Sequence, residues 1–143
     1  MVLGLIWIAR SHVAWCVRLQ QFSAEMIVPL FAGSSAAELA LVSLCAGVGE
    51  ELLFRGLVQS AVGHWISPGV GLLVAGLLFG LAHPLSIAYA VLATLAGIYL
   101  GGLFLACDNL LVPIVTHAVY DFLALLYLLR QPRAAELGPV DRS

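Results

Sequence analysis

Two glutamates and an arginine lie in the middle of a long apolar run, and this feature constrains the fold of the chain more than any other. The cluster is Glu50, Glu51 and Arg55, within the apolar stretch 36–64. A charged side chain at the centre of a bilayer costs about 2.5–3.5 kcal/mol on insertion scales, so such charges are rare and usually functional. The cluster is therefore either a functional site or a buried ion-paired group that holds the register of its helix.

The composition indicates that the chain is surrounded by lipid. Of the 143 residues, 62% are hydrophobic and only 10% are charged, whereas a soluble domain of this size needs a charged surface. The chain contains no lysine and its formal net charge is −2, so we expect no nucleic-acid partner. We expect the lipid bilayer itself as a partner, and the length allows one compact membrane domain.

Four segments are predicted to cross the membrane: 36–64, 69–83, 86–106 and 110–129. The second covers only ~22 Å at ~1.5 Å per residue, which is less than the ~30 Å hydrocarbon core. Pro84 therefore either kinks a longer helix or begins a connection that dips into the membrane. Both interpretations leave His83 below the membrane surface.

The chain is predicted to be an all-α, polytopic membrane helix bundle in three parts. Residues 1–35 combine tryptophan with arginine, which is typical of N-terminal interfacial or partial helices. Residues 36–130 form the core of four transmembrane helices, and 131–143 are a polar, disordered tail. Five of the six arginines lie outside the spans, near the two ends. The positive-inside rule then places both termini in the cytoplasm, and we expect an integral protein of the plasma (inner) membrane.

Small residues are spaced for close contact between helices. Gly76 and Gly80 are four residues apart, as are Gly97 and Gly101. Such pairs let helix backbones approach in a membrane. We expect them to serve packing inside one bundle rather than self-association.

Helical spacing separates the two carboxylates of the charged cluster. Glu51 and Arg55 are four residues apart, with the acid before the base, so they can pair along one face of a helix. Glu50 lies about 100° round the helix from Glu51. Glu50 is therefore the carboxylate left free for chemistry, and Glu51 with Arg55 is predicted to support it.

Three further ionisable groups fall within the predicted spans: His83, His117 and Asp121. His83 follows Phe79 by four residues, so the two share a face. Asp121 follows His117 in the same way, and it can accept a hydrogen bond from the imidazole or present a second ligand beside it. We predict that these groups converge with the glutamate–arginine cluster on one cavity.

A carboxylate beside an imidazole in a partly dry cavity is suited to activating water. A further histidine can stabilise the oxyanion that forms when water attacks an amide. No serine or cysteine is paired with a base at a recognisable spacing, which disfavours an acyl-enzyme route. These groups therefore favour hydrolysis by activated water.

Three short motifs follow one another along the predicted spans: Glu50-Glu51-x-x-x-Arg55, Phe79-x-x-x-His83 and His117-x-x-x-Asp121. Together, in this order, they resemble the motifs of the CPBP family. This family contains type II CAAX prenyl endopeptidases and bacteriocin-processing and self-immunity proteins, also called Abi or lysostaphin-resistance-like proteins. The resemblance covers roughly residues 36–130.

The resemblance implies an intramembrane endopeptidase of the glutamic type, acting on a membrane-associated or lipid-modified peptide or protein. Carried over by position, Glu50 would be the general base that activates water, helped by His83. His117 and Asp121 would form the oxyanion-stabilising side. The remaining motif positions would be supporting residues: Glu51, Arg55 and Phe79.

Asp121 departs from the pattern of many family members, which have asparagine there. An ionised carboxylate repels an oxyanion, so Asp121 must be protonated, orient His117 or bind a metal. The family has also been described as metalloproteases, and a zinc ion would have four adequate ligands: Glu50, His83, His117 and Asp121. We expect a reaction that needs no metal or other cofactor, with zinc as the alternative.

Two other classes of function compete with the enzyme. A proton or cation transporter or relay would use the same buried groups to pass charge, but the chain is short and has no internal repeat. A non-catalytic membrane immunity or scaffold protein would use them to hold its fold. The sequence names neither the substrate nor an oligomeric state.

Overall fold

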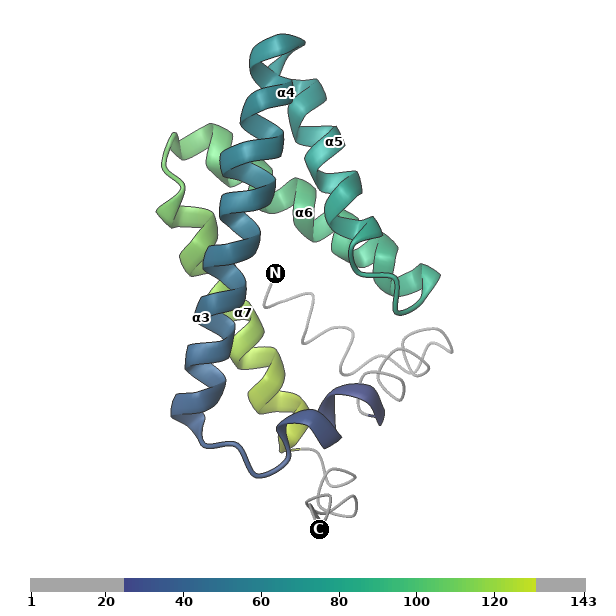
Figure 1. Ribbon diagram of the computed structural model, residues 1–143, viewed down its shortest axis with the longest axis vertical. Coiled ribbons are helices and arrows are strands. Elements are labelled where there is room, and N and C mark those ends of the chain that lie inside the picture. Colours follow the sequence, from purple (N-terminus) through teal and green to yellow (C-terminus); the bar gives the residue numbers. More distant parts are fainter. Residues whose placement is uncertain (1–24, 131–143) are drawn as a thin grey trace. The chain divides into compact units, whose positions relative to one another are not determined.

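Every structural element that the computed structural model describes, over residues 25–130, is helical (Figure 1). The helices predicted within 1–24 and the tail predicted over 131–143 lie outside the described residues. A short helix, Glu25–Phe31, comes first. It is followed by α3 (Ala36–Glu51), the π-helix η1 (Leu52–Gln59), α4 (Ser60–Trp65), α5 (Pro68–Leu81), α6 (Ile87–Cys107) and α7 (Leu111–Leu129).

Two of these helices are long and apolar enough to cross a membrane. They are α6, with 21 residues, and α7, with 19 residues. A third candidate arises if Glu25–Phe31 and the run Ala36–Trp65, which meet at a bend, form one broken span. The predicted second span corresponds to α5, a shorter apolar helix of 14 residues. By length and composition, the described residues thus contain two or three candidate spans, which lie at positions of predicted segments. The predicted number of four spans is not established.

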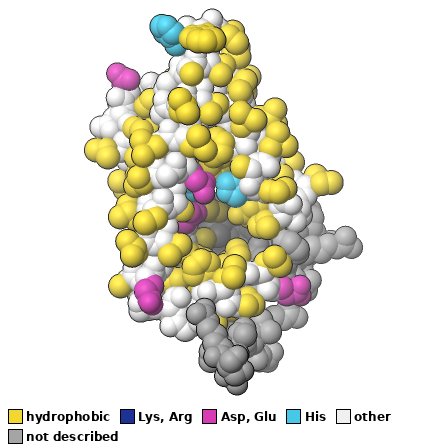
Figure 2. Space-filling view, viewed as in Figure 1, with side chains coloured by type: hydrophobic (Ala, Val, Ile, Leu, Met, Phe, Trp, Pro, Cys, Tyr) yellow, Lys and Arg dark blue, Asp and Glu magenta, His cyan; other side chains and the backbone are white. Residues whose placement is uncertain are grey.

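The described chain forms two compact units. One consists of 25–43 and 119–130, and the other is Leu44–Ala118, which contains η1, α4, α5 and α6 with the adjoining parts of α3 and α7. Large hydrophobic side chains are exposed on nearly every helix, and they dominate the face drawn in Figure 2. With charged groups so few, this surface is that of an integral membrane protein.

The start of α3 is capped by Ser35. The Ser35 hydroxyl accepts a hydrogen bond from the Glu38 N–H at 3.3 Å, and the Glu38 carboxylate accepts one from the Ser35 N–H at 2.7 Å. This reciprocal arrangement is a capping box, which satisfies backbone donors that the first helical turn leaves unpaired.

The helix that starts at Ala36 changes its winding directly after the acidic pair. The segment η1 is π-helical over eight residues, longer than the single-turn π-bulges that usually interrupt α-helices. The Ser60 hydroxyl donates to the Arg55 carbonyl oxygen at 2.8 Å. The wider winding buries three side chains of this segment: Phe54, Arg55 and Gln59.

Glycines allow α5 and α6 to pack closely within the second unit. A Cβ atom on Gly97 would lie 3.1 Å from the Cα of Gly76, and one on Gly76 would lie 2.6 Å from Cγ1 of Ile98. These contacts leave no room for a side chain at either position. The small-residue pairs therefore serve packing inside the bundle, as predicted.

The connection between α5 and α6 excludes one of the two interpretations of Pro84. Helix α5 ends at Leu81 and α6 begins at Ile87, so Pro84 lies in a non-helical connection. The prediction that Pro84 kinks a longer helix is wrong, because no helix continues through it. His83 lies in this connection, immediately after α5.

Candidate active site

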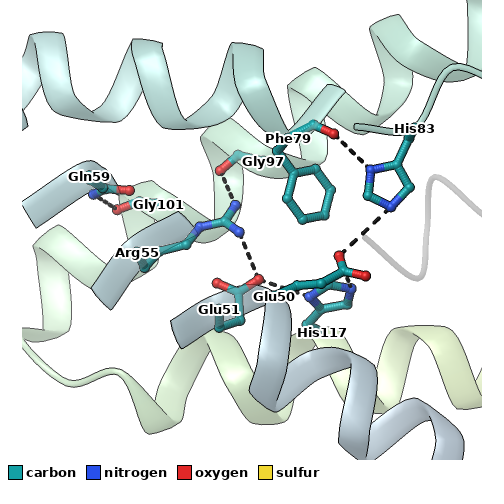
Figure 3. Close-up of polar contacts among 9 residues, drawn as sticks. All are labelled: Glu50, Glu51, Arg55, Gln59, Phe79, His83, Gly97, Gly101 and His117. Carbon is teal, nitrogen blue, oxygen red and sulfur yellow. Dashed lines mark hydrogen bonds and ion pairs between the residues drawn. The ribbon is translucent and has the colours of Figure 1, made fainter. Parts of the chain in front are cut away.

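Glu51 and Arg55 form a buried ion pair where α3 passes into η1 (Figure 3). The Nη1 atom of Arg55 lies 2.8 Å from Oε1 of Glu51, and both side chains are completely shielded from solvent. The other terminal nitrogen of Arg55 donates to the Gly97 carbonyl oxygen of α6 at 2.6 Å. The guanidinium also lies 4.9 Å above the centre of the Phe79 ring. The predicted pairing of these two residues is therefore confirmed, and Arg55 additionally ties η1 to α6.

Gln59 makes the same kind of contact one turn further along η1. Its Nε2 atom donates to the Gly101 carbonyl oxygen at 3.0 Å (Figure 3). A Cβ atom on Gly101 would lie 2.5 Å from the Gln59 side-chain oxygen, so glycine is what admits the amide. Gln59 was not singled out in the sequence; it ties η1 to α6 and is not one of the reacting groups. The sequence signal for this contact is a primary amide four residues after Arg55 in an apolar segment.

Glu50 faces two imidazoles that come from distant parts of the chain. Its Oε2 atom lies 3.7 Å from Nε2 of His83 and 3.9 Å from Nε2 of His117. These distances are too long for direct hydrogen bonds. A small hydrogen-bond donor such as water could contact the Glu50 oxygen together with one of the two imidazole nitrogens. The Glu50 side chain is 32% exposed and that of His83 is 25% exposed, so the group can be reached from outside.

The second nitrogen of each imidazole is held by an acceptor. Nδ1 of His83 lies 2.7 Å from the Phe79 carbonyl oxygen, and Nδ1 of His117 lies 2.8 Å from Oε1 of Glu51. The Phe79 ring stacks on His83 at 4.6 Å and meets His117 edge-on at 5.7 Å between ring centres. Phe79 thus packs against both imidazoles, which is consistent with its predicted supporting place.

The structure brings together Glu50, His83 and His117, all within the compact unit Leu44–Ala118. Asp121 follows His117 by one turn of α7 and belongs to the other unit, so its place beside the reacting groups stays a prediction. In Figure 2, acidic and histidine side chains meet near the middle of an otherwise hydrophobic face. Polar groups in such surroundings are suited to chemistry on a substrate that approaches through lipid.

The described residues do not form a ready-made metal site. Between 25 and 130, no group of three or more histidine, cysteine, aspartate or glutamate side chains is arranged to hold a metal ion. The four ligands of the zinc alternative therefore do not form such a group in this part of the chain.

Comparison with known proteins identifies the family. A family model described as type II CAAX prenyl endopeptidase Rce1-like matches residues 32–123, which is more than half of the chain. The match includes all three motifs, from Glu50 to Asp121. Comparisons with curated proteins and with solved structures gave no match. Membership of this family indicates a protease. The three sequence motifs resemble those of the same type II CAAX prenyl endopeptidases. The chain therefore belongs to the Rce1-like family of type II CAAX prenyl endopeptidases.

Proposed function

We propose that this protein is an intramembrane endopeptidase that cleaves a membrane-associated or lipid-modified peptide by water activated at Glu50. One observation carries the proposal. Glu50 directs Oε2 toward the Nε2 atoms of two histidines, at 3.7 and 3.9 Å, whereas the adjacent Glu51 is fully buried in its pair with Arg55. Two neighbouring carboxylates thus have different environments, and only the exposed one is available to a substrate.

Glu50 acts as the general base in this proposal. A water molecule near its Oε2 gives one proton to the carboxylate while its oxygen attacks the carbonyl carbon of the peptide bond. Glu50 then delivers that proton to the amide nitrogen as the carbon–nitrogen bond breaks. His83, whose Nε2 atom lies 3.7 Å from the same oxygen, holds the water by accepting its second proton in a hydrogen bond. General-base catalysis of this kind contributes about 10²–10⁴-fold to a rate.

His117 stabilises the oxyanion that forms when water attacks the carbonyl group. Its imidazole is 6% exposed, and its Nε2 atom lies 3.9 Å from the same Glu50 oxygen that His83 faces. A donor held in a site with little water stabilises developing negative charge more strongly than solvent does. Asp121, one turn along α7, completes this side by orienting the imidazole or donating from a protonated carboxyl group.

The reaction is proposed to need no metal ion. Glu50 and the two imidazoles supply a base, a partner for the water and a stabilising group without one. The substrate is proposed to be a peptide whose lipid group or membrane anchor delivers it to this hydrophobic surface. A prenylated peptide with a CAAX-type C-terminus is the first probe, because the family contains prenyl endopeptidases.

A cleavage assay on the purified protein in detergent tests the proposal. The substrate is a farnesylated CAAX-type peptide with a fluorophore and quencher on either side of the expected bond, and the unprenylated peptide serves as comparison. We expect Glu50→Gln and His83→Ala each to lower kcat by at least about 10²-fold. Glu38→Gln is the matched control, because it makes the same change at an exposed glutamate of α3. It should leave cleavage unchanged.

Two results would count against the proposal in different ways. Cleavage that survives Glu50→Gln would show that this carboxylate is not the base. Cleavage that stops with a chelator and returns with zinc would replace the metal-free mechanism by a metalloenzyme. Cleavage that tolerates the chelator but needs both Glu50 and His83 supports the mechanism as stated.

A further inference from the structure

We infer that Glu51 is a positioning residue for the peptidase reaction, which fixes the nitrogen of His117 that carries the proton. This inference deepens the proposed function and rests on it for its kinetic consequence. The motif pattern alone assigns Glu51, paired with Arg55, to support of Glu50. The structure adds a second contact, 66 residues away in the chain, between the same carboxylate oxygen and His117.

One oxygen of Glu51 receives two donors. Oε1 lies 2.8 Å from Nη1 of Arg55 and 2.8 Å from Nδ1 of His117. A guanidinium can only donate, and a carboxylate that is paired with it in a buried site is ionised and can only accept. The hydrogen between Glu51 and His117 must therefore belong to the imidazole. This assigns the Nδ1–H tautomer to His117 whenever its ring is neutral.

The tautomer determines what His117 presents to the substrate. A neutral imidazole has one N–H group and one acceptor nitrogen. With Nδ1–H directed at Glu51, the Nε2 atom that faces Glu50 at 3.9 Å is the acceptor. Neutral His117 therefore has no proton to offer an oxyanion, and it can donate from Nε2 only as an imidazolium. Glu51 remains the hydrogen-bond acceptor at Nδ1 of that imidazolium, while Oε2 of Glu50 faces its Nε2 atom.

His83 provides a contrast within the same site. Its Nδ1 atom lies 2.7 Å from the Phe79 carbonyl oxygen, which can only accept. The tautomer of His83 is therefore also Nδ1–H, but the acceptor at this nitrogen is an uncharged backbone carbonyl group and not a carboxylate. Glu50 thus lies between two acceptor nitrogens, and its buried Oε2 has no hydrogen-bond partner among the described residues. The difference between the two rings suits the proposed roles, an acceptor for water at His83 and a charged donor at His117.

Other ionisable groups also surround the His117 ring, and none replaces Glu51 at Nδ1. They are Glu50 from α3, Arg55 from η1 through the shared oxygen, and His83 after α5, whose Nε2 lies 3.7 Å from the same Glu50 oxygen; Asp121 follows His117 by four residues in the sequence. Glu50 faces the opposite nitrogen at 3.9 Å.

Histidine NMR on the intact protein tests the assignment without any substrate. The protein is labelled with ¹⁵N-histidine in detergent, and the His117 signals are identified by their loss in His117→Gln. We expect a protonated Nδ1 and a bare Nε2 for the neutral ring in wild type. A neutral ring with its proton on Nε2 would overturn the inference outright, and this measurement needs no variant of Glu51 to fold.

Kinetics with a matched pair of variants test the consequence. Glu51→Gln keeps the shape of the side chain but removes its charge, and Gln59→Leu removes a comparable buried contact that touches neither imidazole. We expect Glu51→Gln to disturb the His117 tautomer and to lower kcat by about 10-fold to 10⁴-fold, the range for loss of a carboxylate that orients an imidazole. Gln59→Leu should keep the tautomer, with kcat within about twofold per folded protein.

The outcomes separate the inference from the proposed function. Equal losses of kcat in the two variants, or a wild-type His117 spectrum in Glu51→Gln, would reduce Glu51 to a structural residue and overturn the inference. A wild-type protein that cleaves no peptide would overturn the proposed function, while the NMR result would still decide the tautomer.

Discussion

Replacing Arg55 by methionine is expected to destabilise the fold strongly, because it leaves a buried carboxylate without its partner. Arg55 and Glu51 are both completely shielded and lie 2.8 Å apart. Methionine fills much of the same volume but carries no charge and no donor. Glu51 would then keep only the imidazole of His117 as a donor.

The magnitude follows from what the guanidinium contacts. Breaking a buried ion pair by removing one partner costs about 3–5 kcal/mol, mostly from the charge left behind. Arg55 also donates to the Gly97 carbonyl oxygen at 2.6 Å. A hydrogen bond from a charged donor contributes about 1.5–3 kcal/mol on its own. Because the two effects overlap, we expect a total loss of about 3–5 kcal/mol in the free energy of unfolding.

A double variant tests whether the orphaned charge is the cause. If it is, Glu51→Gln together with Arg55→Met is less destabilised than Arg55→Met alone, because the uncompensated carboxylate is gone. Thermal and denaturant unfolding of the purified proteins in detergent measure both variants beside wild type. Arg130→Met is the matched control, since Arg130 is exposed at the end of α7, and its unfolding should match wild type.

Two results would refute this reasoning. A change of less than about 1 kcal/mol in Arg55→Met would mean that the pair contributes no more than a surface salt bridge. A double variant that is less stable than Arg55→Met would mean that Glu51 stabilises the fold by itself, without its partner.

Three further predictions concern the helices that carry the site, and unfolding in detergent measures each. Gly71→Ala should lower the free energy of unfolding by about 1–3 kcal/mol, because its Cβ would meet backbone atoms of Gln59 and Gly63. Gly69→Ala, with open space around the added Cβ, should not destabilise the protein, and equal effects of the two variants would contradict this packing. Asp108→Gly should stabilise by up to about 1 kcal/mol, because the residue after α6 has φ +46°, and a loss would contradict this. Ser86→Ala should cost about 0.5–2 kcal/mol, because the Ser86 hydroxyl caps α6 at 3.1 Å from a backbone N–H; an unchanged stability would show that water replaces the cap.

The positions of the helices could be predicted largely from local sequence. Apolar runs and the polar or proline-containing breaks between them placed 36–64, 86–106 and 110–129 within a few residues of the observed helices. These signals are local, since caps and breakers act within one turn. The π-helical winding of η1 could not be predicted, because it depends on contacts of Arg55 and Gln59 with carbonyl groups of α6, which lie 42 residues away.

The candidate site divides in the same way. The pairing of Glu51 with Arg55 could be predicted, because residues four apart in a helix are neighbours whatever the rest of the chain does. The contact between Glu51 and His117 could not, because nothing in a one-dimensional pattern says which oxygen an imidazole will meet. The distinction matters for function, since that contact decides the tautomer that we infer for His117.

The sequence alone determined that the chain is helical and surrounded by lipid, and that its motifs are those of an endopeptidase family. Composition and short-range spacing carry this information, because burial in lipid and helical periodicity act residue by residue. Only the tertiary structure decided which atoms meet: Oε2 of Glu50 faces Nε2 of both imidazoles, and Oε1 of Glu51 meets Nδ1 of His117. Glycine spacing marks α5 and α6 for close packing, but spacing within one segment does not specify the partner atoms, such as the Gly97 carbonyl oxygen that Arg55 meets 42 residues away.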